Sequence, residues 1–161
     1  MSFANRFAAP RPGPGPGDLQ VGPETAQRRL VLLHGWGADA DDLLELGQEL
    51  VDGEVELVAL RAPGLHPGGS GREWYALAPA PDWSAVPAAR QGLRERLERL
   101  GQTLPLERTV LLGFSQGGAM AVDVATSAAG LPLAGLICCS GYPHPEWRPR
   151  AAGLPVLLTH G

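Results

Sequence analysis

The chain has 161 residues, 44% of them hydrophobic, which suits one domain with a genuine core. Its net charge of -4 argues against a nucleic-acid partner, since phosphate binding needs a basic surface. Its apolar runs are strand-sized, far shorter than the roughly 18 residues of a transmembrane helix, so no membrane span is predicted. All 13 basic residues are arginine, which excludes a lysine Schiff base and a Walker A phosphate loop.

The first segment is rich in proline and glycine and lacks the apolar run of a secretory signal. Residues 1–18 are predicted to form a flexible leader, with a polyproline-type ligand as the alternative. A single domain is predicted over residues 19–161, and residues 18–22 are expected to open it as an edge strand. The neighbouring Cys138 and Cys139 are expected to stay unpaired because adjacent strand residues face opposite ways, which fits a reducing cytoplasm.

After the leader, continuous apolar runs alternate with helix-like segments around one turn-rich stretch. This alternation predicts an α/β domain whose doubly wound, mostly parallel sheet is covered by helices on both faces. Strands are expected at residues 28–35, 54–60, 108–114, 133–141 and 155–161. Helices are expected at residues 39–51, 88–104 and 116–130, and turns at residues 61–75.

The most informative motif is the pentapeptide Gly-Phe-Ser-Gln-Gly at residues 113–117, which fits the pattern G-x-S-x-G. An apolar strand precedes it and a helix follows it, and that context is typical of a nucleophile elbow. The bend would expose the hydroxyl of Ser115 at a helix N-terminus, where the helix dipole favours developing negative charge. The alternative is a glycine-rich turn in which the serine is incidental.

A tetrahedral acyl intermediate also needs two backbone donors aimed at its oxyanion. The amide of Gln116 is one candidate, and the amide of Trp36, in the loop after the strand at residues 28–35, is the other. His34 is expected to brace that loop by hydrogen bonding rather than to act as a base.

The same loop has a rival interpretation. Residues 35–40 fit G-x-G-x-x-[GA] between a strand and a helix, as in dinucleotide-binding domains. The next strand ends at Arg61, where such a domain would carry a ribose-binding acid, although an arginine there would suit a 2′-phosphate. This interpretation leaves the Ser115 elbow unexplained.

Both motifs together resemble the phospholipase/carboxylesterase family of α/β-hydrolases, which includes the acyl-protein thioesterases. The resemblance runs in order through LVLLHGWGAD, LRAPG, GREWY, GFSQGGAMAV, CCSGYPH and PVLLTHG. It implies that Ser115 is the nucleophile and that the amides of Trp36 and Gln116 form the oxyanion hole. Trp74 and Tyr75, within GREWY, would line an acyl groove or pack in the core.

The resemblance also implies a catalytic aspartate just after the strand ending in His160 and Gly161, and a histidine further on. The sequence stops before either, so we expect an α/β-hydrolase fold lacking its last strand and helix, truncated by a frameshift, a premature stop or a gene-model error. Internal substitutes would be Asp123 or Glu146 as the acid, and His34, His66, His144 or His160 as the base. His144 is expected in a surface loop, and Asp123 is expected to point away from the elbow.

The predicted function is hydrolysis of a small-molecule carboxylic ester or thioester without a cofactor or metal, in a chain impaired by its incomplete triad. The alternatives are a non-catalytic hydrolase-fold protein or degenerate gene product and, third, the dinucleotide-binding domain. The final strand would present an exposed apolar edge, through which self-association is predicted.

Overall fold

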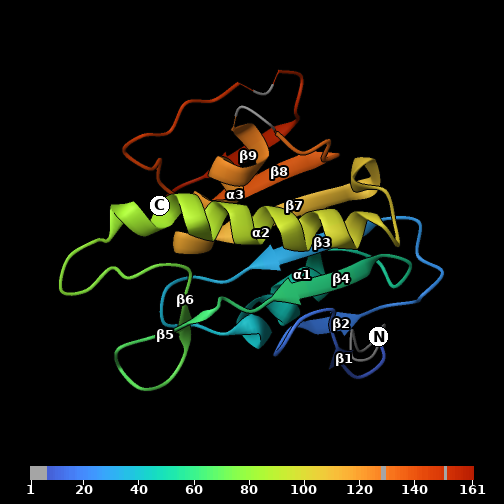
Figure 1. Cartoon of the computed structure of the whole chain (residues 1–161). Helices are drawn as coiled ribbons and strands as arrows, with labels where there is room; N and C mark the ends of the chain where they lie inside the picture. The colour runs from blue at the N-terminus through green and yellow to red at the C-terminus, as the bar shows by residue number, and fades with distance from the viewer. Residues whose placement is uncertain (1–6, 128–129, 151) are drawn as a thin grey trace.

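The computed structural model describes residues 7–127, 130–150 and 152–161, so the first six residues of the predicted leader lie outside the described residues. Its centre is a seven-stranded sheet in the order β1-β2-β4-β3-β7-β8-β9 (Figure 1). The five strands from β4 to β9 run parallel, and β1 and β2 run antiparallel at one side. The strands are β1 (Arg11–Pro12), β2 (Leu19–Val21), β3 (Arg29–Leu33), β4 (Glu56–Leu60), β7 (Thr109–Phe114), β8 (Gly135–Cys139) and β9 (Val156–Thr159).

Helices cover both faces of the sheet because its inner strands are apolar on both sides. On β3, Val31 and Leu33 pack toward one face, while Leu30 and Leu32 pack toward the other. The first face carries α2 (Val86–Gly101) and α3 (Gln116–Thr126), and the second carries α1 (Leu44–Leu50). The predicted doubly wound, mostly parallel sheet is therefore confirmed. Short 3-10 turns η1 (Ala40–Leu43), η2 (Trp83–Ala85) and η3 (Leu106–Arg108) lead into α1, α2 and β7.

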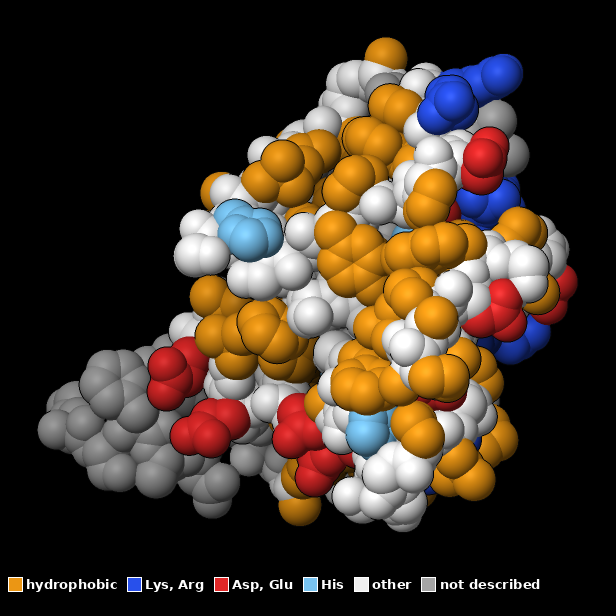
Figure 2. Space-filling view, turned by 90° about the vertical axis from the view of Figure 1, so that its left-hand side faces the viewer, with side chains coloured by type: hydrophobic (Ala, Val, Ile, Leu, Met, Phe, Trp, Pro, Cys, Tyr) orange, Lys and Arg blue, Asp and Glu red, His pale blue; other side chains and the backbone are white. Residues whose placement is uncertain are grey.

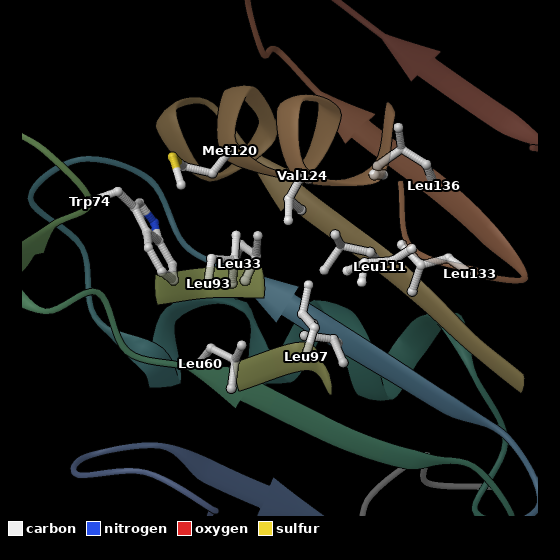
Figure 3. Close-up of a cluster of buried hydrophobic side chains, with 14 of the residues drawn as sticks. Leu33, Leu60, Trp74, Leu93, Leu97, Leu111, Met120, Val124, Leu133 and Leu136 are labelled. Carbon is white, nitrogen blue, oxygen red and sulfur yellow. The ribbon is translucent and has the colours of Figure 1, made fainter. Parts of the chain in front are cut away.

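The larger core lies between α2, α3 and the sheet (Figure 3). Leu93 and Leu97 of α2 meet Leu111 of β7, and Met120 of α3 closes the layer near Trp74. All five side chains are 4% exposed or less. Burying one such side chain stabilises the fold by about 1.5–3 kcal/mol, so this layer holds the strand ends and the helix starts in fixed positions.

A buried arginine ties the C-terminal end of α2 to the sheet. The guanidinium of Arg29, which is 3% exposed, donates to the carbonyls of Leu100 and Leu104 at 2.9 and 3.2 Å. It also pairs with Glu56 at 2.6 Å and donates to the hydroxyl of Thr103. The buried guanidinium is thereby hydrogen-bonded on every nitrogen, and it joins the end of α2 to β3 and β4.

Three segments can be compared directly with the elements that the sequence predicts. Within the predicted leader, β1 pairs with β2, so residues 18–22 do not form the edge of the sheet: β2 is the second strand and β1 is the outer one. The turn-rich stretch contains a small antiparallel hairpin, β5 (Gly64–Leu65) with β6 (Arg72–Glu73). Cys138 and Cys139 are both free, as expected.

The other side of the sheet ends in β9, which pairs with β8 alone. Val156, Leu157 and Leu158 are 48%, 56% and 67% exposed, so this strand is open along its outer edge and on its faces. Self-association through that edge stays a prediction. Among the helices of the described residues, none combines the length and the apolar character that crossing a membrane requires.

Candidate active site

Ser115 stands at a tight bend between β7 and α3, as the motif predicts. Its backbone has φ 54° and ψ -116°, a conformation that costs a non-glycine residue about 1–3 kcal/mol and recurs at functional sites. The bend is held by the amide of Ser115, which donates to the carbonyl of Cys139 at 2.9 Å, and by the amide of Ala119, which donates to the carbonyl of Ser115 at 3.0 Å. The Ser115 side chain makes no hydrogen bond to the described residues.

The two glycines of the motif allow this bend to pack closely. A Cβ atom at position 113 would lie 2.1 Å from the carbonyl oxygen of Gly117. A Cβ atom at position 117 would lie 2.1 Å from the carbonyl oxygen of Leu33 and 2.5 Å from that of His34. Both contacts are with backbone, so glycine is required at these positions for β7, α3 and β3 to meet.

The loop after β3 lies directly against the bend. A Cβ atom on Gly35 would be 3.4 Å from the Cβ of Ser115, which places this loop and the nucleophile candidate at the same sheet edge. Trp36 is fixed by its ring nitrogen, which donates to Glu73 at 2.7 Å, and by edge-on contact with His66. Figure 2 looks onto this edge, where the parallel strands end, and hydrophobic side chains gather across the middle of the face.

The amides proposed for the oxyanion hole have no acceptor among the described residues. Gln116 is the first residue of α3, so its N–H has no partner inside the helix. The N–H of Trp36 likewise donates to no described backbone or side-chain group. One of these unpaired donors follows Ser115 in the chain, and the other follows Gly35, which packs against Ser115.

Trp74 and Tyr75 lie in the core, which is the second of the two roles expected for them. Each is 4% exposed, so their rings do not form the open wall of a groove. The buried side chain of Gln116 accepts from the Trp74 amide at 2.9 Å and donates to the Tyr75 carbonyl at 2.8 Å. The ring nitrogen of Trp74 donates to the His34 carbonyl at 2.9 Å. These residues therefore brace the start of α3 and the loop after β3.

His34 braces its loop, as expected. It is 1% exposed; its Nε2 accepts from the amide of Ala62 at 3.0 Å, which leaves Nδ1 to donate to the carbonyl of Gly35 at 2.8 Å. Both ring nitrogens are thus used by a neutral imidazole. Burial lowers the pKa of His34 below its ordinary value of about 6.5.

This arrangement predicts a pH-dependent stability. The unfolded chain takes up a proton at residue 34 more readily than the folded chain, so the free energy of unfolding should fall as the pH drops below about 6.5. His34→Gln, whose amide oxygen can accept from Ala62, should show a weaker fall. Urea unfolding between neutral pH and about pH 5 measures this difference. If the free energy of unfolding fell equally with pH in the parent and in His34→Gln, the prediction would be contradicted.

A buried carboxylate–histidine pair lies beyond the elbow. His144 is 4% exposed, so the expectation of a surface-loop histidine is wrong: the loop after β8 folds it inward. Its Nδ1 donates to Asp123 of α3 at 2.6 Å, and its Nε2 accepts from the hydroxyl of Tyr75 at 2.9 Å. Arg90 of α2 donates to the other carboxylate oxygen of Asp123 at 2.9 Å.

The charges of this network are balanced. Burial by itself raises the pKa of Asp123, but the hydrogen bonds from His144 and Arg90 outweigh burial and lower it below its ordinary range. Burial raises the pKa of Tyr75. Because Tyr75 occupies the Nε2 of His144, this pair is not directed at Ser115. A single carboxylate in the otherwise apolar helix sequence QGGAMAVDVA was the signal for it.

None of the four histidines hydrogen-bonds to Ser115 in the described part of the chain. His34 and His144 have the partners given above, His66 accepts from the amide of Gly68, and His160 contacts the carbonyl of Gly161. Glu146 is exposed on the surface. The structure thus assembles Ser115, Trp36 and Gln116, and joins Asp123 to His144 rather than to the serine.

Comparison with known proteins gives the context of this geometry. The family model for phospholipase/carboxylesterase proteins matches residues 19–161. Esterase PE8 is 30% identical; the alignment covers 88% of this chain and 72% of that one, with a TM-score of 0.71. The Bacillus cereus carboxylesterase is 24% identical over 88% of this chain and 68% of its own, with a TM-score of 0.74.

A carboxylesterase from Mesorhizobium loti, 18% identical, shares the fold over 92% of this chain and 74% of its own, with a TM-score of 0.78. No curated protein matches the chain significantly. With a family match over most of its length and an elbow of the expected geometry, the chain belongs to the phospholipase/carboxylesterase family of α/β-hydrolases.

Proposed function

We propose that Ser115 is the nucleophile of a hydrolase acting on small-molecule carboxylic esters or thioesters. The observation that carries the proposal is the positive φ of Ser115 at a strand–helix bend with Gly35 packed against it. In the proposed reaction the Ser115 hydroxyl attacks the acyl carbon, and the carbonyl oxygen becomes an oxyanion. The amides of Trp36 and Gln116 donate to that oxyanion. The oxyanion then collapses and expels the alcohol or thiol, which leaves the acyl group on Ser115. Water attacks this acyl-serine, releases the acid and regenerates the serine hydroxyl.

The proton of Ser115 must leave as the hydroxyl attacks, and this step limits the proposed activity. Since no described histidine hydrogen-bonds to Ser115, we expect the 161-residue polypeptide to be a slow catalyst. Serine hydrolases that lack a triad member retain rates only roughly 10³–10⁴ above water. The same observation favours the second candidate, a hydrolase-fold protein that binds acyl compounds without efficient turnover.

The dinucleotide alternative receives no support from the loop after β4. Arg61, the residue that would meet a 2′-phosphate, donates through two of its nitrogens to Asp39 at 2.7 and 3.2 Å. Its guanidinium is therefore already paired within the protein. Membership of the hydrolase family also explains the Ser115 elbow, which the dinucleotide interpretation leaves out.

Acylation of Ser115 tests the proposed function without requiring turnover. The protein is incubated with p-nitrophenyl butyrate at alkaline pH, where hydroxide takes up the serine proton, and its intact mass is measured. We expect one butyryl group, located by peptide mapping on the segment that contains Ser115, because the oxyanion donors favour attack there.

Ser115→Ala is the control for this experiment. It should show no acylated peptide from residues 113–117 while any background on other nucleophiles remains. Acylation found only at histidines or the N-terminus, and equally in the variant, would contradict the assignment of Ser115.

A further inference from the structure

A cavity that Ser115 does not line lies between the hairpin at residues 13–18, the segment after β4, β6 and α2. Its volume is about 340 Å³. Four arginines line it, together with a single carboxylate, Asp18. They are Arg61, Arg72, Arg96 and Arg99. In a chain of net charge -4, this is a local concentration of positive charge that the proposed hydrolysis does not use.

Two of these arginines are neutralised by neighbouring carboxylates. Arg96 pairs with the buried Asp18 at 2.6 Å, and Arg61 pairs with Asp39 at 2.7 Å. The Arg96 side chain is held further by a bond to the Arg61 carbonyl at 2.9 Å and by its position over the Trp74 ring, 5.8 Å from the centroid. These two residues form a fixed wall of the cavity.

The charges of the other two arginines are not balanced by a carboxylate of the described residues. Arg72 donates through Nε and a terminal nitrogen to the carbonyls of Ala62 and Pro63, at 3.0 and 2.6 Å, and pairs with no carboxylate of the described residues. Arg99, in the last turn of α2, has no side-chain hydrogen bond or ion pair within that part of the chain either. Two uncompensated guanidinium groups thus face one cavity, and carbonyl contacts fix the direction of one of them.

The remaining wall is apolar. Pro14 and Pro16 of the hairpin line it together with Ala62 and Pro63 of the segment after β4. The hairpin is pressed onto the arginines: Gly17 has φ 77°, and a Cβ there would lie 2.3 Å from the Cδ of Arg61. The proline–glycine segment that composition marks as a leader therefore forms one side of this cavity.

We propose that this cavity binds a small phosphomonoester. Guanidinium groups match phosphate oxygens in geometry, and a phosphomonoester carries roughly 1.5–2 negative charges at neutral pH, which balances Arg72 and Arg99. The volume lies at the low end of small-molecule sites and exceeds what a phosphate group fills, so the proline wall accommodates the organic part. The proposal requires no chemistry at Ser115 and goes beyond the proposed hydrolysis.

The site is also joined to the loop that carries Trp36. The backbone carbonyl of Arg72 accepts from the amide of Gly37 at 2.8 Å, and the Arg72 amide donates to the carbonyl of Ala38 at 2.8 Å. A phosphate held by the Arg72 side chain would contact a residue whose backbone is bonded to Gly37 and Ala38, the two residues that follow Trp36.

Calorimetric titration of the full chain with glycerol 3-phosphate at low ionic strength tests the site, with glycerol and inorganic phosphate titrated in parallel. We expect glycerol 3-phosphate to bind, inorganic phosphate to bind more weakly and glycerol to give no heat. Arg99→Gln should weaken the affinity by about tenfold or more, because a charge-assisted hydrogen bond is lost. This side chain is exposed and bonded to no described residue, so its loss should leave the fold intact, which circular dichroism checks.

Arg108→Gln is the matched control. Arg108 is an exposed arginine outside the cavity, where its side chain donates to Gln27, so the substitution removes the same charge elsewhere. The affinity of this variant for glycerol 3-phosphate should differ from that of the parent by less than about twofold. Flotation with vesicles containing phosphatidic acid or only phosphatidylcholine shows whether the phosphomonoester is a lipid headgroup or a free small molecule. Flotation specific to phosphatidic acid and lost in Arg99→Gln assigns a lipid headgroup, and its absence assigns a free ester. No binding to either source, or equal losses in Arg99→Gln and Arg108→Gln, would overturn the proposal.

Discussion

Gly117→Ala should lower the free energy of unfolding by about 3 kcal/mol or more, because the added methyl group has no space to occupy. A Cβ at position 117 would lie 2.1 Å from the carbonyl oxygen of Leu33, 2.5 Å from that of His34 and 2.6 Å from the carbonyl carbon of Leu33. All three atoms are backbone, and β3 is held between β4 and β7, so no side-chain rotation relieves the contact.

Gly92→Ala is the control for this prediction, since it adds the same methyl group to a helix at a position with free space around it. Gly92 lies in α2, and a Cβ added there would have nothing within 4 Å, so the substitution should stabilise the protein by about 0.5–1 kcal/mol. Urea unfolding followed by circular dichroism measures both changes. A Gly117→Ala midpoint equal to that of the parent would show that α3 is free to move away from β3.

Asp123→Asn should cost about 2–3 kcal/mol, because it removes the charge that the buried His144 and the half-exposed Arg90 share. The pKa of Asp123 is lowered in the folded protein, so its contribution is present above the unfolded value of about 3.9 and is lost as the pH falls through the folded value. The parent should therefore lose stability in acid more steeply than the variant.

The matched control for this carboxylate is Asp52→Asn. The side chain of Asp52 is 59% exposed and lies 3.7 Å from Arg28, a pair that should contribute less than about 1 kcal/mol. Unfolding free energies measured near neutral pH and again at about pH 2, well below the unfolded carboxylate value of about 3.9, compare the three proteins. Equal acid sensitivity of the parent and Asp123→Asn would show that the pair with His144 is not coupled to folding.

The features predicted correctly from the sequence are those decided by neighbouring residues. The elbow follows from two glycines around Ser115 and from apolar runs on either side, so a local pattern was sufficient. The bracing role of His34 followed from its place in a strand-terminal loop. The parallel sheet followed from the alternation of the runs themselves.

The features that the sequence does not reveal depend on residues that only folding brings together. The apolar sequence of α3 marks Asp123 as unusual, but nothing in the chain identifies His144, on the loop after β8, as its partner. The β1 and β5–β6 pairings involve strands of two residues, too short for any periodicity. Arg72 and Arg99 reach one cavity from β6 and α2, and composition alone indicates a flexible segment where Pro14 and Pro16 complete it.

The exposure of β9 has a consequence for how the molecule opens locally. Its four residues are exposed, and its pairing rests on β8, so little free energy separates its closed state from a detached one. The central strands β3 and β7 lie between paired neighbours and open only when the whole sheet does. Amide hydrogen exchange should therefore be graded across the sheet, fastest at β9 and slowest at its centre. Exchange at the Ser115 bend should be affected as well. The amide of Ser115 donates to the carbonyl of Cys139 on β8, and β9 covers the outer side of that strand.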